Sequence, residues 1–272
     1  MLLLLSLMLL SISGVVNSEL SLDSFSSHRY GSKHIFLLAG QSNMAGRGGV
    51  NGNKWNGFIP PQCQSTPWIH RLNAGLRWEV AHEPLHVDID ENKTCGIGPG
   101  MSFANAIRAS SSKIGVVRLV PCAIGGTKLS EWLRGTQHYN ELVNRARVSL
   151  RGGGVIQALL WYQGESDTTS RMEADSYKGK MEKFITDLRS DLRLPSLPII
   201  QVGLASGEGP FVDKVREAQR RINLQNVAYV DAKCLPVERD HLHLTTQSQV
   251  RLGQMMANAF LKRFKKQLYT KQ

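Results

Sequence analysis

Two segments far apart in this chain of 272 residues hold residue types that can cleave an ester. Ser42 closely follows an apolar run, residues 34–39, and the small residue Gly40. Asp240 and His243 stand three positions apart near the C-terminus, just ahead of an amphipathic helical pattern. A serine hydroxyl becomes a strong nucleophile when a histidine takes its proton, and a carboxylate holds that histidine in the required tautomer. The sequence therefore predicts a Ser-His-Asp triad with Ser42 as nucleophile, His243 as base and Asp240 as acid.

A second histidine, His241, competes for the role of the base. Successive side chains of an extended segment point to opposite sides, so only one of the two histidines can face Ser42. We favour His243 because its offset from Asp240 lets the carboxylate reach the imidazole ring. The other histidines are expected on the surface or in the core: His28, His34, His70, His82, His86 and His138.

Alternating strand and helix patterns must position these residues. Apolar runs predict strands at 34–39, 114–120, 155–161, 197–204 and 227–231, and helical patterns occupy 99–111, 138–151, 171–193, 211–225 and 245–266. This alternation predicts a five-stranded parallel sheet that is covered by helices on both faces. Residues 47–98 are rich in Gly, Asn, Pro and Trp without a sustained period, which predicts a long irregular loop on the active-site side.

Ligands of such sheets bind outside the carboxyl ends of the strands, where donors could stabilise an oxyanion. We expect the backbone amide of Ser42 to point into this cleft. The Gly125-Gly126 pair after the second strand offers unobstructed amides, and Gln163 after the third strand offers a side-chain amide. Possible substrate-binding or supporting residues are Gln41, Asn43, Gly125 and Glu165. For Glu165 the sequence leaves three roles open: a support for the loops, an alternative acid, or part of the substrate pocket.

Four segments carry a resemblance to a known family: GQSNMAG at 40–46, PCAIGGT at 121–127, WYQGESD at 161–167 and DHLH at 240–243. In this order they resemble the four blocks of SGNH hydrolases. More narrowly, the chain looks like the carbohydrate esterase branch, which includes sialate O-acetylesterases, acetyl xylan esterases and plant probable carbohydrate esterases. The resemblance spans about residues 33–262.

The resemblance implies a flavodoxin-like three-layer α/β/α fold, no metal, and deacetylation of O-acetylated sugars. It places the nucleophile at Ser42, the base at His243 and the acid at Asp240. It also implies oxyanion donors at the Ser42 backbone, at Gly126 and at Gln163. The broader superfamily usually has an asparagine donor in the third block, and Gln163 would take its place here.

The N-terminus predicts secretion. Residues 1–16 are apolar and too short to span a bilayer, and Val16-Asn17-Ser18 suits a signal-peptidase site. We expect a signal peptide at 1–18 and one esterase domain at 19–272. Because no Lys or Arg precedes the apolar run, an uncleaved anchor is the alternative. We expect no integral membrane span after cleavage, and an extracellular or cell-wall location.

Secretion would place the cysteines in an oxidising compartment. Four cysteines allow three pairings, and a bridge between Cys63 and Cys95 would pin the 47–98 loop. Asn92 begins the sequon Asn92-Lys93-Thr94.

The distribution of charged residues and histidines limits the partners and cofactors that we expect. The formal charge of +11 is scattered, and its densest group, at 262–266, looks like a solvated helix face, so we expect no nucleic-acid partner. The cluster His82, His86, Asp88 and Asp90 matches no metal-site spacing, so we expect no metal and no cofactor. We favour a monomer that acts on acetylated carbohydrate.

Two other functions are compatible with these residues. The first is a carbohydrate-binding protein without turnover, whose sugar contacts would come from Trp55, Trp68, Trp78 and Trp132. The second is a lipase or thioesterase, which would use the same triad but would need an apolar acyl channel.

Overall fold

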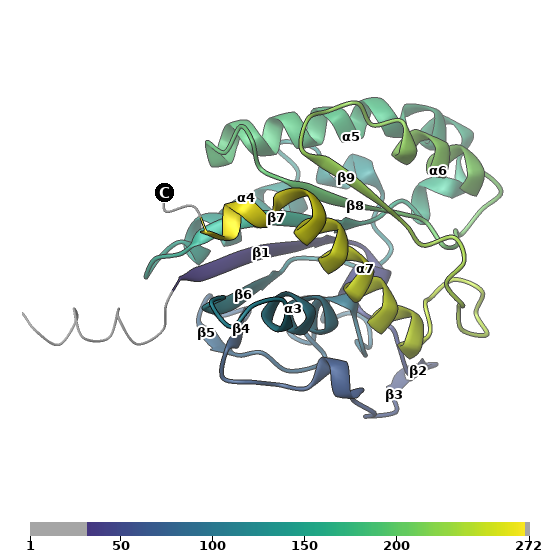
Figure 1. Cartoon of the computed structure of the whole chain (residues 1–272). Helices are drawn as coiled ribbons and strands as arrows, with labels where there is room; N and C mark the ends of the chain where they lie inside the picture. The colour runs from purple at the N-terminus through teal and green to yellow at the C-terminus, as the bar shows by residue number, and fades with distance from the viewer. Residues whose placement is uncertain (1–31, 270–272) are drawn as a thin grey trace, which may run out of the picture. The chain divides into compact units, whose positions relative to one another are not determined.

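The strand that leads to Ser42 is the centre of the fold. In the computed structural model of the chain, which describes residues 32–269, this strand (β1, Lys33–Gly40) lies in the middle of a seven-stranded sheet of order β5-β4-β6-β1-β7-β8-β9 (Figure 1). The other strands are β4 Ile69–Leu72, β5 Trp78–Val80, β6 Val116–Pro121, β7 Val155–Tyr162, β8 Ile199–Gly203 and β9 Val227–Asp231. All neighbouring strands are parallel except β4 and β5, which are antiparallel.

The five predicted strands are all present, but the predicted number of strands was too low. They form the run β6-β1-β7-β8-β9, which is the flavodoxin-like strand order. The 47–98 segment adds β4 and β5 at one edge, and it also forms a separate hairpin of β2 (Val50–Asn51) and β3 (Lys54–Trp55). These strands are two to four residues long, too short to produce a periodic pattern.

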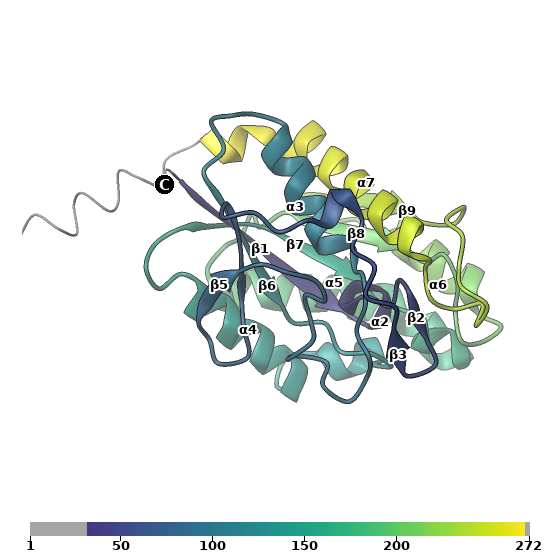
Figure 2. The ribbon, with the colours of Figure 1, turned by 90° about the horizontal axis from the view of Figure 1, so that it is seen from below.

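Helices cover both faces of the sheet, so the predicted three-layer α/β/α fold is confirmed. α3 (Pro99–Ala109) and α7 (Thr246–Phe264) lie together on one face, while α4 (Gln137–Ser149), α5 (Arg171–Leu192) and α6 (Val212–Arg220) lie on the other (Figures 1 and 2). The remaining short helical segments are α2 Ser42–Ala45, η2 Pro61–Cys63, η3 Leu129–Trp132, η4 Ser166–Thr169 and η5 Lys265–Tyr269.

Aromatic side chains join the sheet to the helices on each face. Phe36 of β1 packs edge-on against Phe103 of α3 and Phe260 of α7, with ring centroids 4.9 and 5.2 Å apart. On the other face, Trp161 of β7 packs against Phe184 of α5 at 4.6 Å. Buried aromatic rings stabilise a core mainly through the apolar area that they remove from water. The central strands β1 and β7 are therefore firmly held next to the site.

The carboxyl ends of β1, β6 and β7 meet in register. Gly40 pairs with Tyr162, and Leu38 pairs with Pro121. Gly40 has φ of 131°, and a Cβ atom there would lie 2.0 Å from the Tyr162 carbonyl oxygen. Only glycine fits such a position, because other residues avoid positive φ and have a Cβ atom. This close approach sets the start of the turn that carries Ser42.

The structure tests the prediction about the cysteines but not the prediction of a signal peptide. The signal peptide at 1–18 and its cleavage site lie outside the described residues. Between residues 32 and 269 no helix is long and apolar enough to cross a bilayer. The bridge predicted between Cys63 and Cys95 is absent, since both thiols are free and buried. Cys95 instead contacts the Arg47 guanidinium and the His86 carbonyl oxygen.

Candidate active site

Ser42 lies at the junction of β1 and the one-turn helix α2. The Gln41 amide donates to the Tyr162 carbonyl oxygen at 2.9 Å, which ties the turn to β7. Ser42 is the first residue of α2, so its own amide has no carbonyl partner within the helix. Only 5% of Ser42 is exposed. Among the described residues the Ser42 amide donates to no group, so it is available at the carboxyl ends of the strands.

The turn before α7 brings His243 to Ser42. The His243 Nε2 atom lies 2.9 Å from the Ser42 Oγ atom, and His243 Nδ1 lies 2.7 Å from an Asp240 carboxylate oxygen. The other Asp240 oxygen accepts the amides of Leu242 and His243 at 2.9 and 3.0 Å. The aspartate therefore fixes both the backbone of the turn and the orientation of the ring.

The charge of Asp240 defines the histidine tautomer. Burial raises the pKa of Asp240, but hydrogen bonds from the His243 amide, the Leu242 amide and the His243 ring outweigh burial and hold the pKa below its usual value. A carboxylate can only accept hydrogen bonds, so His243 Nδ1 carries the proton. The lone pair of Nε2 then faces the Ser42 hydroxyl, which is the arrangement that a general base needs.

His241 points elsewhere. It is exposed, has φ of 57°, and its amide donates to the Glu238 carbonyl oxygen. Thr245 caps α7 through a bond from the Ser248 amide, as expected for a residue just ahead of this helix. Of the two histidines in the turn, the structure brings only His243 to Ser42.

Asn43 and Gln41, which flank the serine, are completely buried and link the turn to distant segments. The Asn43 side chain donates to a Glu165 oxygen at 2.8 Å and to the Leu242 carbonyl oxygen at 3.3 Å, and it accepts the Leu244 amide at 2.9 Å. The Gln41 side-chain oxygen accepts the amide of Gly164 at 3.1 Å. Both amides are supports that hold the histidine turn and the third sequence block against α2.

Gln163 is not placed as an oxyanion donor, which corrects the sequence prediction. Its side chain is fully buried, and its amide nitrogen donates to the Thr127 carbonyl oxygen at 2.9 Å and to Asp167 at 2.6 Å. Its side-chain oxygen accepts the Tyr177 hydroxyl at 3.0 Å. These partners lie in the interior, so Gln163 links β7 to the loop after β6 instead of facing Ser42.

The two glycines after β6 differ in their contacts. A Cβ atom at Gly125 would lie 3.5 Å from the Ser42 Cβ atom, so Gly125 borders the serine directly. Its amide donates to Asp90 at 3.2 Å and is therefore occupied. Gly126 has φ of 77°, and a Cβ atom there would meet nothing within 4 Å. Among residues 32–269, the Gly126 amide donates to no group.

Glu165 is an acid in the interior. Burial raises the pKa of Glu165 to about 7, and the hydrogen bond from Asn43 opposes this effect. Its second carboxyl oxygen is buried without a partner among the described residues. Of the three roles that the sequence left open, these contacts favour that of a support for the loops.

The structure also adds three charged residues that sequence analysis did not connect with Ser42. Arg47 and Asp90 form a buried ion pair beside Gly125. Asp167 holds Gln163 and the Leu129 amide, and burial raises its pKa to about 6 although the bond from Gln163 lowers it. Arg47 directly follows the serine block and could have been noticed for that reason, whereas the sequence drew attention to Asp90 only as a member of a cluster without metal-site spacing.

The predicted cluster of His82, His86, Asp88 and Asp90 is divided, because Asp90 pairs with Arg47 beside Gly125 while Asp88 points to another partner. Within the described part of the chain no group of three or more His, Cys, Asp or Glu side chains could hold a metal ion. Asp88 pairs with Arg71, and burial lowers the pKa of His86 to about 3. Trp132 is buried against Trp161 at 5.4 Å and is not available to a sugar.

The fold and the four sequence blocks together define an SGNH-type hydrolase. Residues 32–262 match the family described as carbohydrate esterase, sialic acid-specific acetylesterase, and the chain belongs to this family. The predicted family is thereby confirmed.

Individual relatives agree with this assignment. A probable carbohydrate esterase of Arabidopsis thaliana is 54% identical over 237 residues, which cover 85% of this chain and 91% of that protein. An X-ray structure of the Arabidopsis protein superimposes with a TM-score of 0.82 at 54% identity, over 85% of this chain and 98% of that one. The fold is also shared with NanS, at a TM-score of 0.68 and 15% identity over 87% of this chain and 99% of that one.

Proposed function

We propose that this protein is a secreted serine esterase that removes O-acetyl groups from carbohydrate through Ser42, His243 and Asp240. The observation that carries the proposal is the 2.9 Å contact between Ser42 Oγ and His243 Nε2, with Asp240 behind the ring. The family provides the ester chemistry and the carbohydrate class of substrate.

In the first half of the reaction Ser42 becomes acetylated. The Ser42 oxygen attacks the ester carbonyl carbon while His243 Nε2 takes the hydroxyl proton, and Asp240 stabilises the imidazolium that forms. The tetrahedral intermediate collapses when the bond between the carbonyl carbon and the sugar oxygen breaks. His243 gives its proton to that oxygen, and the deacetylated sugar leaves.

In the second half water releases the acetyl group. His243 removes a proton from a water molecule, which attacks the carbonyl carbon of the acetyl-serine. The bond to Ser42 Oγ then breaks, the proton returns to the serine, and acetate departs. The same histidine thus acts as base and acid in both halves.

Two backbone amides are suited to hold the oxyanion. The Ser42 amide is free at the start of α2, and the Gly126 amide is free after β6 among the described residues. Donors that are fixed before the reaction stabilise the developing negative charge without reorganisation. We therefore assign the oxyanion to Ser42 and Gly126, without the Gln163 side chain.

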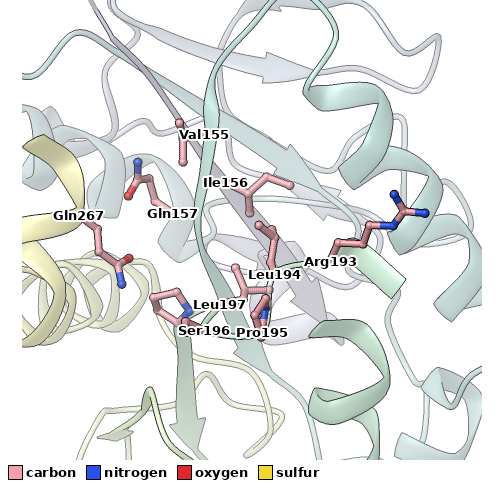
Figure 3. A pocket seen from close by; sticks show the side chains of 10 residues that line it. Val155, Ile156, Gln157, Arg193, Leu194, Pro195, Ser196, Leu197 and Gln267 are labelled. Carbon is pink, nitrogen blue, oxygen red and sulfur yellow. The ribbon is translucent and has the colours of Figure 1, made fainter. Parts of the chain in front are cut away.

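The surroundings of the triad suit a polar substrate. A groove of about 660 Å³ beside Asp240 is lined by polar side chains that include Asn51, Asn56, Arg239 and Thr246. A cavity with a more apolar lining, about 410 Å³ in volume, lies at the amino end of β7 (Figure 3). Ser42 follows the carboxyl end of the parallel strand β1, so this cavity is at the opposite edge of the sheet. The polar side chains of the groove beside Asp240 suit carbohydrate better than a long acyl chain.

The location follows from the apolar N-terminus. Residues 1–16 have the length and composition of a signal peptide, and Asn92 of the sequon is exposed. We propose export to the cell exterior, with a monomer as the working form. Expression in a secreting host, followed by N-terminal sequencing of the protein in the medium, tests export and the cleavage near Ser18.

Substitution of Ser42 tests the mechanism. We expect Ser42→Ala to lower hydrolysis of an aryl acetate by at least about 10³-fold while the unfolding transition stays unchanged. A fluorophosphonate probe should label the unaltered protein at Ser42 and leave the variant unlabelled. An unlabelled, inactive wild-type protein that still binds sugars would instead support the binding-protein alternative. Acetate release from a panel of acetylated polysaccharides then identifies the sugar.

A further inference from the structure

A buried ion pair lies against the serine turn and takes no part in the triad. The Arg47 guanidinium contacts an Asp90 carboxylate oxygen, and the two residues are 6% and 3% exposed. The same Asp90 oxygen accepts the Gly125 amide at 3.2 Å. A Cβ atom placed on Gly125 would lie 2.7 Å from Arg47, 3.1 Å from Asp90 and 3.5 Å from the Ser42 Cβ atom. Both charges therefore lie close to the place where an oxyanion on Ser42 would form.

The long 47–98 segment delivers this pair. The segment leaves the serine turn at Arg47 and returns to it near Gly96. Gly48 and Ile97 exchange two backbone hydrogen bonds of 2.9 Å, and the Gly96 amide donates to the Gly46 carbonyl oxygen. Within the segment, the His86 carbonyl oxygen accepts the Asp90 amide at 3.0 Å. The acid is thus held by a closed loop whose two ends pack beside Ser42.

Resting on the proposed function, we infer that Arg47 and Asp90 are positioning residues for the oxyanion site. Asp90 holds the Gly125 amide, which fixes the following peptide and leaves the Gly126 amide free for the oxyanion. Arg47 neutralises Asp90, so that no bare carboxylate faces the negative charge that develops on the tetrahedral intermediate. The pair therefore aligns one donor and removes a repulsion.

If Arg47 acts by neutralising Asp90, removing both charges should do less harm than removing Arg47 alone. Arg47→Met removes the guanidinium and leaves Asp90 unneutralised, so we expect kcat to fall at least tenfold while KM changes less than threefold. Adding Asp90→Asn removes the negative charge and keeps an oxygen for the Gly125 amide. The double variant should therefore recover most of the lost kcat, because the unpaired charge is gone and the Gly125 amide keeps an acceptor.

Two further measurements separate positioning from folding. Rates are expressed per serine labelled to completion by fluorophosphonate, so that misfolded protein is not counted. The affinity for a phenylboronic acid, whose serine adduct resembles the tetrahedral intermediate, should fall and recover in parallel with kcat. The matched control is Asp88→Asn in the same segment, since Asp88 joins buried Arg71 and the Ala74 amide but not Gly125. This control should keep kcat within twofold.

An unchanged kcat in Arg47→Met, or a double variant no faster than the single one, overturns the inference. If Arg47→Met does not fold, the comparison of Asp90→Ala with Asp90→Asn decides, because only asparagine keeps an acceptor for the Gly125 amide. The inference requires the asparagine variant to be at least tenfold faster, and equal rates contradict it. A wild-type protein without esterase activity would instead refute the proposed function.

Discussion

Two regions are bonded to the serine turn through Asn43, and they are built differently. The histidine turn, residues 238–244, is largely exposed and made of local contacts: Asp240 bonds His243 three residues away. The third sequence block, residues 161–167, is buried and bonded to Gln41 and Asn43 across more than a hundred positions of sequence. The imidazole that must exchange protons with water and substrate is partly exposed, while the side chains of the third block are removed from solvent.

The carboxyl groups of the two regions show the same contrast. Asp240 keeps a low pKa because amide and imidazole donors outweigh its partial burial. Glu165 has its pKa raised to about 7, because full burial outweighs the single bond from Asn43. One acid is thus kept charged beside the imidazole, and the other holds its proton in the interior up to a pH of about 7.

The largest expected loss of activity comes from a substitution in the histidine turn. His243→Ala removes the base, and we expect the rate of aryl acetate hydrolysis to fall by at least about 10³-fold. The fold should persist, because the Asp240 bonds to the backbone amides of the turn remain. Steady-state kinetics and thermal unfolding check this result, and an active variant would show that another group serves as base.

The next largest effect is expected from removing the Asn43 side chain, which links the two regions. Asn43→Ala removes three bonds that join Glu165, Leu242 and Leu244. We expect a loss of about 2–4 kcal/mol in unfolding free energy and a fall of about tenfold or more in kcat. Asn105→Ala is the matched control, because Asn105 also bonds three carbonyl groups but lies away from Ser42. It should lower stability only. Equal kcat values for the two variants would argue against a positioning role for Asn43.

A smaller effect, on the pH dependence of stability, tests the difference in pKa between Glu165 and Asp240. Since the folded pKa of Glu165 lies above its ordinary value of 4.5, the folded state holds the proton more tightly than the unfolded state. The contribution of Glu165 to stability is therefore full below about pH 4.5 and is lost as the pH rises through 7. We expect Glu165→Gln to flatten the fall in unfolding free energy between pH 5 and pH 8, measured by denaturant titration. Parallel pH dependences of variant and wild type would contradict the buried, proton-holding acid.

The smallest effect tests the choice between the two histidines. His241→Asn keeps a residue that tolerates the left-handed conformation at φ 57° and removes the exposed imidazole. Hydrolysis should change less than twofold, and the pH dependence of kcat should stay the same. A large loss in this variant would transfer the role of base to His241.

The sequence predicted the regular parts of the fold because those parts repeat. Strand β9 begins and ends where the apolar run 227–231 does, and α7 falls within the predicted 245–266. The short strands β4 and β5 were missed, since three or four residues carry no period. They form because β4 pairs with the edge of β6 and β5 then pairs with β4. Ser42, Asp240 and His243 were named from residue type and spacing, which the chemistry of proton transfer constrains strongly.

What the sequence by itself determined is the family, the alternating α/β order and the residues of the proposed triad. Those features depend on local pattern and on motifs that keep their order along the chain. Only the tertiary structure decided that Gln163 is an interior link, that Gly125 is occupied by Asp90, and that Arg47 and Asp90 lie beside Ser42. The physical reason is that a donor becomes available or occupied according to which partners reach it through space, and residues far apart in the sequence provide those partners.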